Sequence, residues 1–198
     1  MSAASPAPSA FQRARTWAYG NVLIGTLERL AAGLSHLPAN APKRHGLRVE
    51  RDLAYGDDPA QKLDIWIPDG PGPHPVAVYI HGGGFQFFDR RTHWLFAMGY
   101  AQAGFLTFSL SYRLAPKHPF PAGVQDVAAA ARWIAREAPG RGGDPERMVW
   151  AGESAGANLA LGLAIQTCWR RPEPWAGAVF DEVPPPKVLL PACGYLEV

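Results

Sequence analysis

The chain has 198 residues, of which 47% are hydrophobic and 18% charged, and its formal net charge is +2. This length is sufficient for one sizeable hydrophobic core, and the composition is typical of a globular protein. Lysines and arginines are scattered along the chain, so we expect no nucleic-acid partner.

The N-terminal part of the chain differs in character from the rest. Residues 1–10 are rich in Ala, Ser and Pro, which predicts a disordered tail. Residues 11–46 carry apolar positions at helical spacing, and the predicted helical segment either packs on the core or rests on a membrane surface. The segment is too polar to span a bilayer, and the N-terminus lacks a signal-peptide pattern, so we expect no transmembrane segment and a cytoplasmic location.

Residues 47–198 form the predicted core domain. Helical patterns at residues 94–103, 124–135 and 155–168 separate the later apolar runs. The alternation of strands and helices predicts an α/β fold, with a mainly parallel sheet that helices cover on both faces. The predicted strands lie near residues 48–54, 62–67, 76–80, 105–109, 147–151 and 188–190.

The predicted strand at residues 76–80 runs directly into His81 and three glycines, Gly82, Gly83 and Gly84. Glycines without side chains let backbone N–H groups approach a negatively charged oxygen, such as the one that forms during acyl transfer. The loop therefore indicates an oxyanion hole. The alternative is a flexible strand-to-helix turn.

The sequence Gly-Glu-Ser-Ala-Gly at residues 152–156 follows another apolar run and precedes an alanine-rich helical pattern. A serine between two glycines at such a turn is lifted out of the sheet edge with its hydroxyl exposed. We therefore expect Ser154 to be a nucleophile. The alternative is an ordinary glycine-rich turn.

Together these motifs resemble the α/β-hydrolase superfamily, and within it the hormone-sensitive-lipase-like carboxylesterases. Residues 111–121 and 143–147 resemble further segments of that family. The resemblance implies that Ser154 is the nucleophile of an esterase or lipase, acting on a small-molecule ester and water without a cofactor or metal. It also implies an oxyanion hole of the N–H groups of Gly83, Gly84 and Ala155, with Gly82 shaping the loop, and a cap formed by residues 11–46.

The catalytic base of this family is missing from the expected part of the sequence. The triad runs in the order Ser, Asp or Glu, then His, yet no histidine follows Ser154. Loss of the histidine costs on the order of 10⁶ in turnover in a comparable enzyme. We therefore expect a C-terminally truncated, poorly active esterase that lacks the last strands and helices of the fold. Alternatives are a non-hydrolytic binding module or an amidase or formamidase on the same fold.

Two smaller groups of residues allow further expectations. Cys168 and Cys193 lie in apolar surroundings without a metal-ligand spacing, which predicts buried thiols. Phe85 and Phe87 follow the glycine loop closely, so they either line an acyl pocket or pack in the core.

Overall fold

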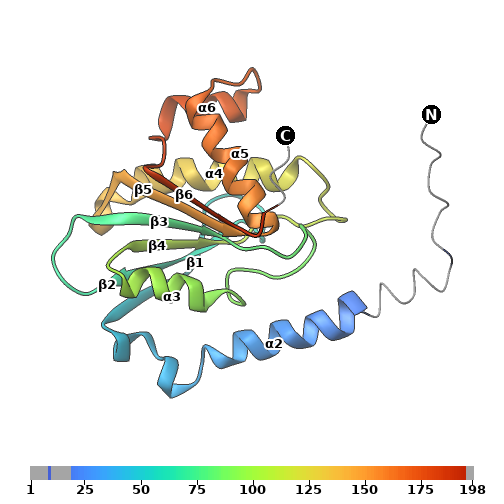
Figure 1. Cartoon of the computed structure of the whole chain (residues 1–198), viewed down its shortest axis with the longest axis vertical. Coiled ribbons are helices and arrows are strands. Elements are labelled where there is room, and N and C mark those ends of the chain that lie inside the picture. Colours follow the sequence, from blue (N-terminus) through green and yellow to red (C-terminus); the bar gives the residue numbers. More distant parts are fainter. Residues whose placement is uncertain (1–8, 10–18, 195–198) are drawn as a thin grey trace.

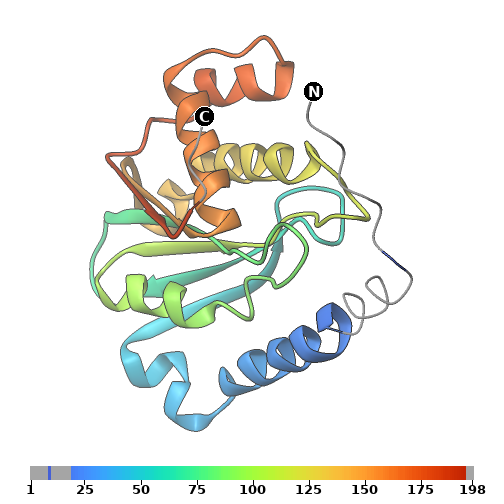
Figure 2. The same cartoon turned by 45° about the vertical axis from the view of Figure 1, so that its right-hand side comes forward.

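The computed structural model describes residue 9 and residues 19–194 (Figure 1). The predicted tail, Ser9 apart, and the first part of the predicted helical segment lie outside the described residues. The described chain begins with the π-helix η1 (Tyr19–Ile24), the helix α2 (Gly25–Leu34) and the short 3-10 helices η2 (Pro38–Asn40) and η3 (Pro42–His45). These elements form the lower margin of the molecule in both views (Figures 1 and 2).

Six strands form one sheet in the order β1-β2-β4-β3-β5-β6. Strands β4, β3, β5 and β6 run parallel to one another, whereas β1 and β2 are antiparallel to their neighbours. The α/β prediction and its mainly parallel sheet are confirmed. The strand bounds are β1 (Leu47–Ala54), β2 (Lys62–Pro68), β3 (His74–Ile80), β4 (Leu106–Leu110), β5 (Gly143–Glu153) and β6 (Val188–Ala192).

Strand β5 begins earlier than the apolar run at residues 147–151 predicts. Gly143 and Asp144 pair with His74 and Pro75 before a bulge shifts the register of β3 and β5. Beyond the bulge the pairing ends with Ile80 opposite Gly152. The glycine loop after β3 and the serine turn after β5 are therefore neighbours at one edge of the sheet.

Helices cover both faces of the sheet. Helix α3 (Trp94–Gln102) lies on one face, where its Trp94, Ala97 and Met98 pack with Trp66 of β2. On the other face lie α4 (Ala122–Glu137), α5 (Ala155–Cys168) and α6 (Pro174–Glu182), and the short 3-10 helix η4 (Pro139–Arg141) joins α4 to β5 (Figure 1). Helices α3, α4 and α5 match the predicted helical patterns, whereas α6 was not predicted.

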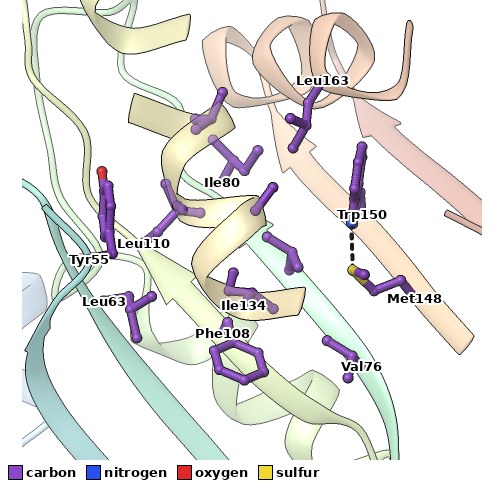
Figure 3. Close-up of a cluster of buried hydrophobic side chains, with 14 of the residues drawn as sticks. Tyr55, Leu63, Val76, Ile80, Phe108, Leu110, Ile134, Met148, Trp150 and Leu163 are labelled. Atoms are coloured by element: carbon purple, nitrogen blue, oxygen red, sulfur yellow. Dashed lines mark hydrogen bonds between the residues drawn. The ribbon is translucent and has the colours of Figure 1, made fainter. Parts of the chain in front are cut away.

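The main core lies between the sheet and helices α4 to α6 (Figure 3). Every second residue of the central strands points into it, because successive side chains of a strand face opposite sides of the sheet. Its fully buried members include Val76, Ile80, Leu110 and Trp150, with Ile134 and Leu163 from the helices. Trp150 donates its indole N–H to the sulfur of Met148 at 3.1 Å, so its buried polar atom has a partner.

The prediction of buried thiols is wrong. Cys168 and Cys193 are both exposed free cysteines. Cys168 is the last residue of α5, and Cys193 follows the edge strand β6, so each lies beyond the part of its element that packs on the core. An apolar sequence neighbourhood did not distinguish the end of an element from its middle.

Candidate active site

Ser154 occupies a sharp turn between strand β5 and helix α5. Its backbone has φ 52° and ψ −117°, a conformation that costs a residue with a side chain about 1–3 kcal/mol. The surrounding hydrogen bonds hold it: the N–H of Ser154 donates to the carbonyl of Ala192 at 2.8 Å, and its own carbonyl accepts from Asn158 N–H at 3.2 Å. The turn has the backbone geometry that the sequence motif predicts.

Both glycines that flank Ser154 are required by close backbone contacts. A methyl group on Gly152 would lie 2.5 Å from the carbonyl carbon of Gly156. A methyl group on Gly156 would overlap the carbonyl oxygen of Ile80 and lie 2.7 Å from that of His81. Helix α5 therefore begins against the end of strand β3, where the glycine loop starts.

The glycine loop is anchored by His81. The ring of His81 is fully buried and stacks on Tyr112 at 4.4 Å between ring centroids. Its Nδ1 lies 2.7 Å from the carbonyl oxygen of Gly82, which can only accept, so Nδ1 carries the proton. Burial lowers the pKa of His81 to about 4, and the ring is neutral near pH 7.

The two glycines that follow adopt conformations that favour glycine. Gly83 and Gly84 have φ of +107° and +59°, respectively. A methyl group on Gly83 would also overlap the carbonyl oxygen of Phe87, whereas the space around Gly84 is open. The carbonyl of Gly83 accepts N–H groups of both Gln86 and Phe87 at 3.0 Å, which closes the loop into a tight turn.

Glu153 joins the glycine loop to the serine turn. Its Oε1 accepts the backbone N–H of Gly82 at 2.7 Å and lies 3.2 Å from Nε2 of His93. The other ring nitrogen of His93 lies 2.8 Å from Oγ1 of Thr92. The N–H of Gly82 is thus already engaged with the carboxylate. The sequence indicated no role for Glu153, because its partners are brought to it only by the pairing of β3 and β5.

Tyrosines near Glu153 stay protonated. Burial, and then the charge of Glu153, raise the pKa of both Tyr79 and Tyr112. The hydroxyl of Tyr112 donates to the carbonyl of His81 at 3.0 Å. Both rings therefore shape the site as neutral groups.

Two buried charge networks hold the segments around the loop. Arg90, which is buried, donates to Oδ1 of Asp64 at 2.8 Å and to Oγ of Ser111 at 3.1 Å, and it also pairs with Asp52. In the segment at residues 111–121, Arg113 donates to both carboxylate oxygens of the fully buried Asp126 in α4. Sequence reasoning missed both networks, since each joins residues far apart in the chain.

A cleft of about 1520 Å³ lies between α2 and the segment after the glycine loop. Helix α2 borders it with Glu28 and Ala32, and Phe87 and Phe88 line the opposite side. Glu28 also accepts the backbone N–H of Phe88 at 2.6 Å, which fixes α2 beside this segment. Phe87 thus borders a cavity, whereas Phe85 is 41% exposed and Trp94 packs in the core beneath α3.

A smaller pocket of about 340 Å³ adjoins the turn itself. It is bordered by Glu153 and Ala192 at the sheet edge and by Tyr79, Phe96 and Tyr100 near helix α3. Phe96 stacks on Tyr79 at 5.2 Å between ring centroids, so one wall of the pocket is aromatic.

The positions of the histidines bear on whether Ser154 has a catalytic base. Within residues 19–194, no histidine is hydrogen-bonded to Ser154. His36 and His118 border the large cleft, and His93 is oriented by Glu153. The described residues also contain no group of three or more His, Cys, Asp or Glu side chains placed to hold a metal ion. None of the helices that the structure describes is long and apolar enough to cross a membrane.

Comparison with known proteins identifies relatives among esterases. Residues 77–181 match the model of a family described as alpha/beta hydrolase fold. The chain is 44% identical over 122 residues to carboxylesterase NlhH of Mycobacterium tuberculosis, which covers 60% of this chain and 38% of that protein. It is 39% identical over 144 residues to esterase LipI of the same species, covering 70% of this chain and 44% of LipI. The chain therefore spans about two fifths of the length of these relatives.

Solved structures of esterases also resemble this chain over most of its length. A bacterial heroin esterase matches with a TM-score of 0.69 and 27% identity, covering 88% of this chain and 51% of that one. Esterase LipW of Mycobacterium marinum matches with a TM-score of 0.67 and 28% identity, covering 88% of this chain and 52% of LipW. With the family match across residues 77–181, these findings show that the chain belongs to the α/β-hydrolase fold family, in its hormone-sensitive-lipase-like branch.

Proposed function

We propose that the protein is a serine carboxylester hydrolase that forms an acyl-enzyme on Ser154. The observation that carries this proposal is the strained backbone of Ser154 at the strand-to-helix turn, directly beside a glycine loop that Glu153 ties to the same turn. Strain of this kind persists only where the surrounding structure determines it, and it is typical of functional sites. The esterases among the relatives support the same conclusion.

The first half-reaction follows from this arrangement. The Oγ of Ser154 forms a bond to the ester carbonyl carbon, and the carbonyl oxygen becomes an oxyanion. The N–H groups of Ala155, Gly83 and Gly84 stabilise it, each for about 2.7–4 kcal/mol by analogy with other enzymes. Ala155 is suited to this role because N–H groups in the first turn of a helix have no acceptor within that helix. The C–O bond to the alcohol then breaks, and the alcohol leaves with the proton that Oγ gave up on attack, which water carries between them.

The second half-reaction removes the acyl group and regenerates the free hydroxyl of Ser154. Water adds to the acyl carbon, the same donors stabilise the second oxyanion, and the carboxylic acid departs as Oγ regains its proton. Since Gly82 donates its N–H to Glu153, its part is to position the loop rather than to bind the oxyanion. Since no histidine in the described part of the chain is hydrogen-bonded to Ser154, the hydroxyl is a weak nucleophile and turnover is slow.

Helix α2 serves as part of a cap in this proposal. It borders the large cleft on one side, opposite Phe87 and Phe88. Its Ala31 carbonyl accepts the indole N–H of Trp94 at 3.0 Å, so it is fixed to α3 as well as to the segment after the loop. The smaller pocket at the turn has an apolar and aromatic lining, which includes Tyr79, Phe96 and Leu190, and it favours an ester with an apolar acyl or alcohol group.

The experiment is hydrolysis of p-nitrophenyl butyrate by the purified chain and by Ser154→Ala. We expect a slow release of p-nitrophenol that the substitution abolishes. Equal rates for the two proteins would contradict a role for Ser154. The corresponding p-nitroanilide distinguishes an ester hydrolase from an amidase or formamidase, which would cleave the amide at a comparable rate.

A second candidate is a binding module that holds acyl ligands without hydrolysing them. The position of all six histidines before Ser154 in the sequence favours it. This candidate predicts that butyrate or octanoate raises the melting temperature of the chain while p-nitrophenyl butyrate is not consumed. Stabilisation by the ligand follows from preferential binding to the folded state.

A further inference from the structure

Helix α2 presents its apolar side chains to solvent rather than to the body of the protein. Leu23, just before the helix, and Leu27, Leu30 and Leu34 within it are between 48% and 61% exposed. The residues of α2 that border the cleft are small or polar; they are Gly25, Glu28, Arg29 and Ala32. No residue of α2 is fully buried. The apolar face of this amphipathic helix therefore points to solvent, whereas the apolar face of a helix that packs on a core points inward.

The exposed leucines form one continuous stripe. They are spaced four, three and four residues apart along the chain, which places them on one side of a helix. We call Leu23, Leu27, Leu30 and Leu34 the leucine stripe. Contiguous apolar patches on a protein surface mark sites of interaction with another protein or with a membrane.

The part of the chain around the stripe is strongly basic. Residues 1–48 contain six of the 19 Lys and Arg residues but only one of the 17 Asp and Glu residues, so they carry +5 while the remaining residues carry −3. Within the described part, four of these cations are exposed and none forms an ion pair with another described residue; they are Arg29, Lys43, Arg44 and Arg48. By contrast, Arg51, Arg90, Arg113 and Arg141 all pair with carboxylates.

These features favour a lipid surface over a second copy of the chain. A stable protein dimer buries roughly 800 Å² on each partner. Four half-exposed leucines, three on a ten-residue helix and one just before it, offer much less than that, and the unpaired cations near them would repel their own copies. An anionic bilayer, in contrast, offers both an apolar layer for the stripe and phosphate groups for the cations.

We propose that α2 docks the protein on anionic lipid bilayers. The leucine stripe enters the boundary between head groups and acyl chains, and Lys43 and Arg44 bind lipid phosphates. Element η3, which carries Lys43 and Arg44, lies at the same margin of the molecule as α2 (Figures 1 and 2). This docking does not depend on catalysis.

The test is flotation of the 198-residue chain with vesicles of phosphatidylcholine, with and without phosphatidylglycerol. We expect flotation with the anionic vesicles, which weakens in about 1 M NaCl because the screening length falls to about 3 Å. The double variant Leu27→Ser, Leu30→Ser should lower the partition coefficient at least about tenfold. The matched control is Ile165→Ser, an exposed apolar residue of α5 on the far side of the sheet, which should leave it unchanged.

Charge reversal tests the role of the cations. The double variant Lys43→Glu, Arg44→Glu should abolish flotation. Its control is the double variant Arg170→Glu, Arg171→Glu, which changes the net charge equally at exposed positions beyond α5 and should leave most of the flotation intact. Circular dichroism confirms that each variant is folded. Failure of the chain to float with anionic vesicles, or equal flotation of both charge variants, would overturn the proposal. So would a lipid-free dimer, seen by light scattering, that the leucine substitutions convert to monomer.

Discussion

The carboxylate of Glu153 accepts a hydrogen bond from the backbone N–H of Gly82 at 2.7 Å, between residues 71 positions apart in the chain. This bond joins the glycine loop after β3 to the turn after β5. The two motifs are thereby held as one unit. His93 contacts the same oxygen at 3.2 Å, so the bridge also reaches the start of α3.

Removing this carboxylate should loosen the loop. Glu153→Ala leaves the N–H of Gly82 without its acceptor, and we expect the free energy of unfolding to fall by about 1–3 kcal/mol. Glu153→Gln should retain most of the stability, because the amide oxygen can still accept. Urea unfolding and hydrogen exchange of the Gly82 amide measure both effects. Glu146→Ala, at an exposed position of the same strand, is the control, and an equal change in both alanine variants would refute the bridge.

The contact between α5 and β3 should tolerate no side chain at Gly156. Gly156→Ala places a methyl group against the carbonyl oxygen of Ile80, which belongs to the central sheet and cannot move aside. We expect a loss of at least about 2 kcal/mol, or failure to fold. Gly162→Ala on the same helix meets nothing within 4 Å and should stabilise the protein by about 0.5–1 kcal/mol. Thermal melting of both variants decides, and similar melting temperatures would contradict the described packing.

The ion pair between Arg113 and Asp126 should be costly to break. Asp126 is fully buried, and Arg113 contacts both of its oxygens. Arg113→Ala leaves an uncompensated buried charge, for which we expect a loss of about 3–5 kcal/mol in urea unfolding. Arg136→Ala removes a surface contact of 3.6 Å to Glu182 and should cost less than about 1 kcal/mol. If both variants lost the same stability, the buried pair would have no special role.

His81 should make stability depend on pH. Burial lowers its pKa to about 4 in the folded protein, against about 6.5 in the unfolded chain. Between about pH 4 and about pH 6.5 the unfolded chain binds more protons than the folded protein. The contribution of neutral His81 to the free energy of unfolding is therefore complete above about pH 6.5. It is lost as the pH falls toward 4, in total on the order of 3 kcal/mol.

The variant His81→Asn isolates this contribution. Its side-chain amide can still donate to the carbonyl of Gly82 but does not titrate. Urea unfolding at about pH 7 and about pH 5 should show the original chain losing about 2 kcal/mol more than the variant. The same loss in both proteins would mean that folding does not lower the pKa of His81.

The sequence predicted the parts of this fold that depend on local pattern. Apolar runs marked all six strands, and the glycines around Ser154 marked the turn, because close backbone contacts there exclude side chains. Helix α6 was not predicted, since prolines lie at both of its ends, at Pro172 and Pro174 and at residues 184–186, and clustered prolines usually indicate a loop. The order of the strands also could not be read from the sequence, since it depends on which strand crosses over to which neighbour.

Contacts between residues far apart in the chain could not be predicted from the sequence either. Asp126 lies within a helix whose other inward residues are apolar, and only the folded chain brings Arg113 and Gln61 to it. The apolar residues of α2 left open whether the helix packs on the core or rests on a membrane surface, and the structure turns them outward. Periodicity identifies an apolar face but does not state what that face contacts.

The central claim, that Ser154 is the nucleophile, is tested most directly by covalent labelling with a p-nitrophenyl alkylphosphonate. Attack by Oγ on phosphorus releases p-nitrophenol and leaves a stable adduct whose mass is measured on the intact chain. We predict a single adduct, located by peptide mass spectrometry on Ser154 and absent from Ser154→Ala. Labelling that persists in Ser154→Ala, or a folded chain that takes up no phosphonate, would contradict the claim.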